Sequence, residues 1–290
     1  MELANLLSLK TAVPYLRLFR NQLLVVKVGG EAVEDESRLR QLVEQLNVLH
    51  QLGIGLVIVH GGGPQATALG EQLGVESHFV AGRRVTSPAM VEAMVMALNG
   101  TVRTKILAAC RAQHLNVLGV SGIDAGIVKA TQRPPRKLPT GETVDFGQVG
   151  DIASLDVSPL RMMVEQGFVP VVSSLAADDA GTVLNINADD VASAIAVALG
   201  ASKLILITKP RGIMGDVDKP ETLMSEITIA ELEALEAKGV VHAGMLPKSG
   251  AAKSALTGGV ERVHVISYEY PDSVLAELFT NEGCGTMVTP

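Results

Sequence analysis

The chain of 290 residues contains no tryptophan, and aromatic residues make up only 3% of it, although 47% of its residues are hydrophobic. Its core must therefore be built mainly from Val, Ile, Leu and Ala, a composition typical of parallel sheets covered by helices. Positive charge is not in excess, because the formal net charge is −7 at pH 7, so we expect no nucleic-acid partner. No segment reaches the ~18 consecutive apolar residues of a membrane helix, so no membrane partner is expected either.

Cysteine is scarce as well. Cys110 and Cys284 are the two cysteines of the chain, and they do not form a C-x-x-C pair. We therefore expect no metal site, and reduced thiols are preferred over a disulfide, which the sequence alone leaves open. The N-terminal residues MELANLLSLK begin with an acidic residue and do not resemble a secretory signal, so a cytoplasmic location is expected.

Apolar runs that predict strands alternate with helical patterns along the chain. This alternation predicts β-α-β units and an α/β fold, in which an open, mainly parallel central sheet lies between two layers of helices. Strands are expected at 23–28, 54–60, 116–120, 167–174, 203–208 and 260–267. Helices are expected at 35–53, 64–74, 88–113, 157–166, 187–200, 228–238, 247–257 and 272–280.

Two segments depart from this alternation. Residues 121–150 contain Pro-Pro, Pro-Thr-Gly and basic residues, and they predict β-hairpins and a loop laid over the sheet in the N-terminal half. Residues 1–20 carry apolar residues at helical spacing, interrupted by Pro14. This N-terminal arm is either a helix packed on its own domain or an arm that docks on another subunit.

A lysine in an apolar strand points to an anion site. Lys27 lies within LLVVKV, and Gly29 and Gly30 directly follow this run. A buried lysine is costly unless it meets an anion, and glycines expose the backbone amides that phosphate needs. A second strand, VIVH, runs into Gly61, Gly62 and Gly63. One such loop could be a tight turn, but two in succession favour a phosphate site, although neither G-x-x-x-x-G-K-[ST] nor G-x-G-x-x-G occurs.

Three further stretches carry polar groups at the start of predicted helices. NINADD places Asn185, Asn187 and Asp189 at the start of a predicted helix, where Asn and Asp are ordinary capping residues; this explains Asn187 but not the second asparagine, Asn185. GMLPKSG places Lys248 in a turn before a helix of small residues, and GRRVT supplies a pair of arginines. Each of these alone is also compatible with a solvated surface group.

Taken in order, KVGG, HGGGPQ, GRRVT, GVSGIDAG, NINADD, GMLPK and GCGTMV resemble the amino acid kinase family, over about residue 20 to the C-terminus. The resemblance is to the branch that transfers the γ-phosphoryl group of ATP to the side-chain carboxylate of N-acetyl-L-glutamate, in the second step of arginine biosynthesis. It implies the fold of that family, with about 21–180 as the acceptor-substrate and dimerisation half and about 181–290 as the nucleotide half.

The resemblance also implies roles for the residues above. Lys27 and Lys248 match the two lysines on either side of the transferred phosphoryl group, and Asp189 matches the aspartate that orients them and keeps them protonated. The glycines that match the amide donors are Gly29, Gly30, Gly61 and Gly62. Arg84 and Asn185 match the groups that hold the α-carboxylate of the substrate, where a guanidinium suits bidentate binding. Mg²⁺ would arrive with ATP and would not need a dedicated protein cage.

Arginine-inhibited members of the family have an N-terminal helix that links dimers into a hexamer, and residues 3–19 resemble that helix. A dimer, and a trimer of dimers, is therefore expected. The positions that match the arginine site are Tyr15, Lys203, His264, Glu282 and Gly285. A nitrogen-signalling partner is suggested by analogy alone.

Two positions depart from the family pattern. After KLILIT the family has an acidic residue on the adenine side, whereas this chain has Thr208, Lys209 and Pro210. Lys209 either contacts a phosphate or alters nucleotide binding, and both interpretations stay open. Before NINADD the frequent tyrosine is replaced by Leu184.

Two other functions remain as alternatives. One is a related kinase for another carboxylate, such as aminoadipate on a carrier protein, although Arg84 and the Gly61–Gly63 triplet favour a small free acceptor. The other is a non-catalytic arginine-sensing subunit, which would have no use for the lysine pair and Asp189.

Overall fold

In the computed structural model the described residues are 13, 17, 19–80, 83–138, 141–216, 219–241 and 244–290. Most of the predicted N-terminal arm, including Tyr15, lies outside these ranges. The described end of the arm is anchored by an aromatic contact: Phe19 is buried, and its ring meets that of Phe279 edge to face at 5.4 Å.

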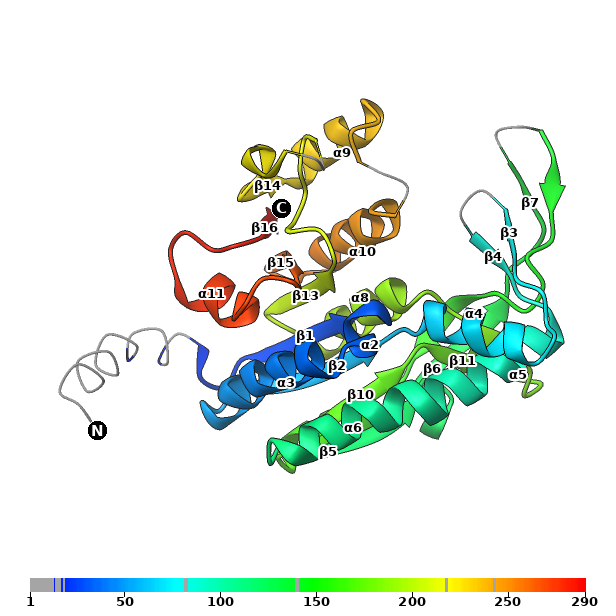
Figure 1. Cartoon of the computed structure of the whole chain (residues 1–290), viewed down its shortest axis with the longest axis horizontal. Helices are drawn as coiled ribbons and strands as arrows, with labels where there is room; N and C mark the ends of the chain where they lie inside the picture. Colours follow the sequence, from blue (N-terminus) through cyan, green and yellow to red (C-terminus); the bar gives the residue numbers. More distant parts are fainter. Residues whose placement is uncertain are drawn as a thin grey trace.

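An eight-stranded sheet forms the centre of the molecule, in the order β14-β16-β15-β13-β1-β2-β10-β5 (Figure 1). Its neighbouring strands pair in parallel except for β15 and β16, so the predicted open, mainly parallel sheet is confirmed. The strands are β1 (Leu23–Val28), β2 (Gly55–His60), β5 (Val117–Ser121), β10 (Val169–Ser173), β13 (Lys203–Thr208), β14 (Glu226–Thr228), β15 (Arg262–Ser267) and β16 (Thr286–Thr289).

Helices cover both faces of this sheet because its strands are apolar on both faces. Leu24 and Val26 of β1 pack into one core cluster, and Val25 packs into the other. The first cluster is covered by α2 (Glu31–Glu34), α3 (Glu36–Gln51), α6 (Arg103–Ala112) and α11 (Ser273–Phe279). The second is covered by α7 (Ser158–Glu165), α8 (Ala188–Leu199), α9 (Ile229–Ala237) and α10 (Leu246–Thr257).

The irregular region over the N-terminal half is built from short strands, as predicted (Figure 1). A four-stranded sheet contains β12 (Val183–Asn185), β11 (Leu175–Ala177), β6 (Val128–Gln132) and β9 (Gly150–Leu155) in that order. Two hairpins accompany it, β3 (His78–Val80) with β4 (Arg83–Val85), and β7 (Arg136–Lys137) with β8 (Thr143–Val144). Short 3₁₀ turns lie at Asp124–Gly126 and Pro220–Thr222.

The helix expected at 88–113 is confirmed over Pro88–Ala112, but it is not α-helical throughout. It consists of α5 (Pro88–Val95), a π-helical segment (Met96–Val102) and α6. The wider turns accompany close packing: a side chain added at Gly62 would meet Leu98 at 3.0 Å and Val102 at 3.2 Å. The remaining helix, α4 (Gly63–Gln72), begins at the second glycine loop.

The carboxyl ends of five neighbouring strands, β15, β13, β1, β2 and β10, lie along one edge of the central sheet. Such an edge is where open α/β sheets place their ligands. The sheet runs without interruption through the two predicted halves, and the division into an acceptor half and a nucleotide half stays a prediction.

Candidate active site

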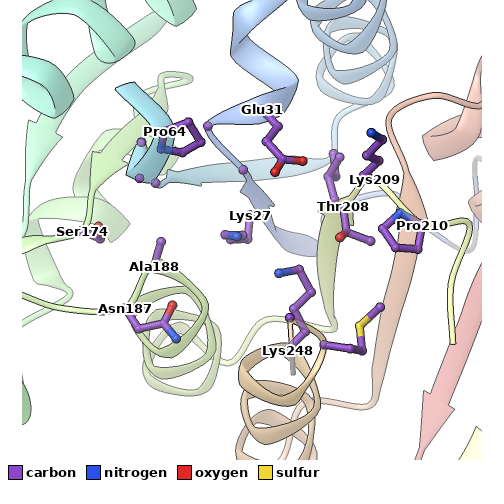
Figure 2. Close-up of a pocket in the computed structure, with 18 of the residues that line it drawn as sticks. Lys27, Glu31, Pro64, Ser174, Asn187, Ala188, Thr208, Lys209, Pro210 and Lys248 are labelled. Carbon is purple, nitrogen blue, oxygen red and sulfur yellow. The ribbon is translucent and has the colours of Figure 1, made fainter. Parts of the chain in front are cut away.

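A cavity of about 760 Å³ opens at this edge of the sheet (Figure 2). Each of the five strand ends contributes to its wall: Lys27 and Gly29 at β1, Gly61 at β2, Ser174 after β10, Thr208 at β13 and Tyr268 after β15. The starts of α4, α8 and α10 and several loops between elements also contribute to the wall. The cavity therefore gathers most of the candidate residues that the sequence identified.

The two glycine loops lie side by side, because β1 and β2 pair in parallel with Val28 opposite His60. A Cβ atom added at Gly30 would lie 3.0 Å from the Cα of Gly62, so glycine is what allows the loops to approach each other. One expected donor is already engaged, however: the amide of Gly61 donates to the carbonyl of Val28 at 3.1 Å. This corrects the expectation that all four glycine amides are donors to phosphate or acceptor oxygens.

Lys27, Lys248 and Asp189 converge as expected. The Nζ atom of Lys27 lies 2.8 Å from Oδ1 of Asp189, and that of Lys248 lies 3.5 Å from Oδ2. The Asp189 side chain is only 5% exposed, so the two ammonium groups supply the charge balance that burial requires. Because Asn187 caps α8 by accepting the amide of Asp189 at 2.9 Å, the first turn of the helix aims this carboxylate at both lysines.

The charges of the cluster affect one another. Burial alone would raise the pKa of Asp189, but the charges of Lys27 and Lys248 hold that pKa below its usual value. The pKa of Lys248 is lowered, first by burial and then by the Lys27 charge, against the opposing effect of Asp189. Asp189 thus acts on Lys248 in the expected direction without restoring its ordinary pKa.

The predicted acceptor residues lie at the other end of the cavity. Arg84 is held by two hydroxyl groups: its guanidinium donates to Thr67 Oγ1 at 2.6 Å and to Ser77 Oγ at 2.7 Å. Its planar group also stacks on Phe79, 4.6 Å from the ring centroid. The Asn185 amide donates to Thr86 Oγ1 at 3.3 Å. These contacts present a guanidinium and an amide at one wall, a combination suited to a carboxylate.

The predicted nucleotide side is mostly apolar. Thr208 and Lys209 both line the cavity, and in Figure 2 the Lys209 side chain points away from Lys27 and Lys248. The other lining residues here are Ile207, Pro210, Gly212, Ile213, Met214, Val240, Val241, Gly244 and Met245. An apolar slot with few polar groups suits a flat ring system. The second departure from the family pattern, Leu184, is buried in the core and does not line the cavity.

Sequence reasoning missed three polar residues of the cavity, Glu31, Ser174 and Tyr268. The Tyr268 hydroxyl donates to Oε2 of Glu31 at 3.2 Å. A signal for Glu31 was present, since it directly follows the Gly29-Gly30 pair, whereas nothing in the pattern around Tyr268 pointed to the cavity.

The residues assigned to an arginine site lie away from this cavity. Lys203 and His264 are buried on the neighbouring strands β13 and β15. The carboxylate beside His264 belongs to Glu277, with Nδ1 to Oε1 at 2.8 Å, and the amide of Gly285 donates to the same carboxylate at 2.9 Å. Glu282 is exposed, and Tyr15 lies outside the described residues. Glu277 is therefore a buried acid that the sequence did not reveal.

In the part of the chain that the structure describes, no group of three or more His, Cys, Asp or Glu side chains could hold a metal ion. No described helix is long and apolar enough to cross a bilayer.

Comparison with known proteins places this arrangement in a family. The model of the "Amino acid kinase family" matches residues 22–267. The chain belongs to the amino acid kinase family. Among its relatives is the acetylglutamate kinase of Symbiobacterium thermophilum, which is 40% identical over 97% of this chain and 96% of the relative. The acetylglutamate kinase of Archaeoglobus fulgidus is 39% identical over 99% of both chains.

Solved structures of the amino acid kinase type agree with this placement. An N-acetylglutamate synthase from Neisseria gonorrhoeae, complexed with coenzyme A and N-acetyl-glutamate, has a TM-score of 0.83 at 28% identity. The match covers 97% of this chain but only 62% of the synthase chain. Carbamate kinase from Giardia lamblia bound to AMP-PNP has a TM-score of 0.67 at 18% identity, covering 93% of this chain and 98% of that chain, which supports the fold alone.

Proposed function

We propose that this chain is a kinase that transfers the γ-phosphoryl group of ATP to the side-chain carboxylate of N-acetyl-L-glutamate. The product is an acyl phosphate, and the reaction is the second step of arginine biosynthesis. The observation that carries the proposal is the convergence of Lys27 and Lys248 on Asp189 beside the two glycine loops. Near 40% identity to acetylglutamate kinases along almost the whole chain supports the choice of acceptor.

The reaction needs positioning and charge neutralisation more than acid–base chemistry. The acceptor is already a carboxylate, so one of its oxygens attacks the γ-phosphorus without loss of a proton. The bond from the γ-phosphorus to the bridging oxygen breaks, and ADP leaves with that electron pair. Two anions must approach each other, and the ammonium groups of Lys27 and Lys248 offset that repulsion where charge develops.

The two ends of the cavity give each substrate its orientation. Arg84 and Asn185 would hold the α-carboxylate of the acceptor, so that its side-chain carboxylate reaches the glycine loops. The apolar slot beyond Thr208 would hold the adenine ring, and the loop at Gly29 and Gly30 would hold the phosphates. Effective alignment of two bound reactants can supply much of the rate enhancement in such a reaction.

The acceptor assay tests this proposal directly. Purified protein with Mg²⁺-ATP and N-acetyl-L-glutamate should release ADP and form an acyl phosphate that hydroxylamine traps as a hydroxamate. Glutamate, aminoadipate and N-acetylaminoadipate serve as competing acceptors. Product with one of these and none with N-acetyl-L-glutamate would retire the substrate assignment, and no product with any of them would favour a sensing subunit.

We further propose that L-arginine inhibits this enzyme from a site beside Lys203, His264, Gly285 and Glu282. Lys203 supports this, because its buried ammonium lies over the ring of Phe19 at 5.5 Å and forms no ion pair with a described residue. Burial, with the nearby charge of Arg262, lowers the pKa of Lys203 to about 8, and a bound carboxylate would relieve that cost. The site adjoins the described end of the N-terminal segment, in keeping with a hexamer of three dimers. The proposed enzyme would act in the cytoplasm.

Arginine titration tests the regulatory proposal. Millimolar-range arginine should lower the rate, whereas Lys203→Met should remove the inhibition and keep the uninhibited rate. Deleting residues 1–19 should also remove inhibition and reduce the mass on a sizing column. An unchanged mass after the deletion would refute the assembly role of the segment.

A further inference from the structure

Glu31 places a carboxylate in a cavity that is otherwise arranged for anions. It is the first residue of α2, directly after Gly29 and Gly30, and it lines the same cavity as Lys27 and Lys248. In Figure 2 its carboxylate points into the space between the glycine loop and Thr208, on the side opposite Lys248. A phosphate bound at this loop would meet that negative charge, and the repulsion would weaken binding unless a cation lay between them.

Tyr268 fixes the direction of this carboxylate. Its hydroxyl donates to Oε2 of Glu31, and its backbone amide donates to the carbonyl of Thr208 at 3.0 Å. The guanidinium of Arg38 lies over the Tyr268 ring, 5.6 Å from the centroid. Burial, together with the Glu31 charge, raises the pKa of Tyr268 to about 12, so this hydroxyl remains a neutral donor. One carboxylate oxygen, Oε2, is therefore held in place in a residue that lines the cavity.

Among the described residues, no cation lies close enough to form an ion pair with Glu31. No ion pair within 4 Å joins it to any of the residues that the structure describes, in contrast to Asp189 with its two lysines. Its field does reach Lys248, where it opposes the lowering of the pKa that burial causes. Glu31 thus acts on the region where the phosphates would lie and still lacks a counterion.

We propose that Glu31 supplies a carboxylate oxygen to the divalent cation that accompanies the nucleotide, so that this chain binds Mg²⁺ partly through its own side chain. The inference rests on the proposed function only in requiring a nucleotide whose phosphates lie at Gly29 and Gly30. Mg²⁺ is commonly held by one or two carboxylates together with phosphate oxygens and water. With a cation in between, the contact between Glu31 and a phosphate becomes attractive.

A contact to the ribose hydroxyls is the competing role for a carboxylate on the nucleotide side. The position favours the metal, because Glu31 follows the phosphate loop without an intervening residue and its charge acts on Lys248. The two roles differ in one measurable respect. A metal ligand strengthens nucleotide binding only when the cation is present, whereas a ribose contact strengthens it with or without the cation.

The test measures Mn²⁺ binding to the full chain in the presence of ADP, by electron paramagnetic resonance of free Mn²⁺. Glu31→Gln should raise the Kd for Mn²⁺ on the order of 10-fold. The same variant should bind metal-free ADP more tightly than the unaltered chain, because the repulsion is gone. Tyr268→Phe should weaken Mn²⁺ binding by a smaller factor, since it loses only the orientation of the carboxylate.

Glu34→Gln is the matched control. Glu34 lies on the same short helix, does not line the cavity, and accepts a hydrogen bond from Gln65 Nε2 at 3.3 Å. Its substitution should leave both dissociation constants unchanged, and melting temperatures should confirm that each variant is folded.

Two results would overturn the inference. If Glu31→Gln leaves Mn²⁺ binding unchanged, the carboxylate is not a metal ligand, and if it weakens ADP equally with and without Mn²⁺, the contact is to the ribose. Neither result depends on the acceptor, which is absent from the experiment. A wild-type chain that binds Mn²⁺-ADP but does not phosphorylate N-acetyl-L-glutamate would instead sink the proposed substrate and leave this inference standing.

Discussion

Two buried carboxylates, Asp189 and Glu277, are neutralised in different ways. Asp189 meets two flexible ammonium groups, Lys27 from β1 and Lys248 from α10. Glu277 meets His264 at 2.8 Å and accepts the backbone amides of Cys284 and Gly285 at 2.8 and 2.9 Å. Cations on side chains of separate elements remain available to a substrate, whereas amides of the backbone are committed to the fold. The group around Asp189 is therefore expected to serve catalysis, and the group around Glu277 is expected to serve the stability of the fold.

The largest expected effect comes from Asp189→Asn. The two ammonium groups would lose the carboxylate that aligns them, and we expect kcat to fall roughly 100- to 1,000-fold, as when other preorganised charge is removed from a site. Steady-state ADP release measures the change. Asp190→Asn is the control, because Asp190 is exposed and does not line the cavity. If Asp189→Asn kept the kcat of the unaltered chain, the catalytic role assigned to Asp189 and its two lysines would be wrong.

For Glu277→Gln the opposite pattern is expected. The free energy of unfolding should fall by about 2–3 kcal/mol, because a charged acceptor of two amides and a histidine is lost from the interior. The kcat of the folded fraction should remain close to that of the unaltered chain. Urea denaturation followed by an activity assay measures both, with the exposed Glu282→Gln as a control that changes neither. Loss of kcat at full stability would contradict the structural role.

A third prediction concerns how the free energy of unfolding depends on pH. The group responsible is His60, which lies beside the second glycine loop and not near Glu277. Burial, with a smaller effect of Arg103, lowers the pKa of His60 from 6.5 to about 4. Between these values the unfolded chain binds the extra proton, so stability rises with pH across this window and is lost as pH falls from 6.5 toward 4. This one group should lower the free energy of unfolding by about 2–3 kcal/mol between pH 6.5 and 4.5.

His60→Asn removes that titration. The variant should be less stable at pH 7.5, where the smaller side chain leaves a cavity, yet its stability should change less between pH 6.5 and 4.5. Urea denaturation at several pH values makes the comparison. Parallel curves for the variant and the unaltered chain would show that another group causes the acid sensitivity.

The smallest effect is expected when a hydroxyl group that positions the Arg84 guanidinium is removed. The Thr67 hydroxyl donates to the Gly63 carbonyl at 2.9 Å and accepts from Arg84, which makes it a fixed support for the guanidinium. Thr67→Val should raise the KM for the acceptor on the order of 10-fold and leave kcat nearly unchanged. Thr67→Ser should restore the KM. An equal loss of kcat in both variants would contradict a positioning role.

Much of this arrangement could be predicted because parallel strands end at a common edge. Lys27 and the two glycine loops follow apolar runs, so their meeting at that edge required only that β1 and β2 be neighbours. Asp189 and Lys248 came from resemblance to a family, since an acid at a helix start and a lysine in a turn have ordinary explanations when seen alone.

The other features of the fold and the site depend on tertiary packing, which the sequence pattern does not reveal. The π-helical segment at Met96–Val102 lies within a stretch to which an ordinary helical period continues to fit. Glu277 lies on a short helix and gains its role from amides seven and eight residues away. The acid suggested by resemblance, Glu282, is exposed. The Gly61 amide is taken up by Val28, a detail of strand register.

The position of β1 between β2 and β13 has a consequence for the order of assembly. Its register joins Leu24 to Leu56 on one side and to Lys203 on the other, so one partner is near in the chain and the other is very distant. Pairing across such separations is slow, because loop-closure entropy is lost before the contacts form. During synthesis the strand that carries Lys27 therefore keeps one side unpaired until residues 203–208 emerge.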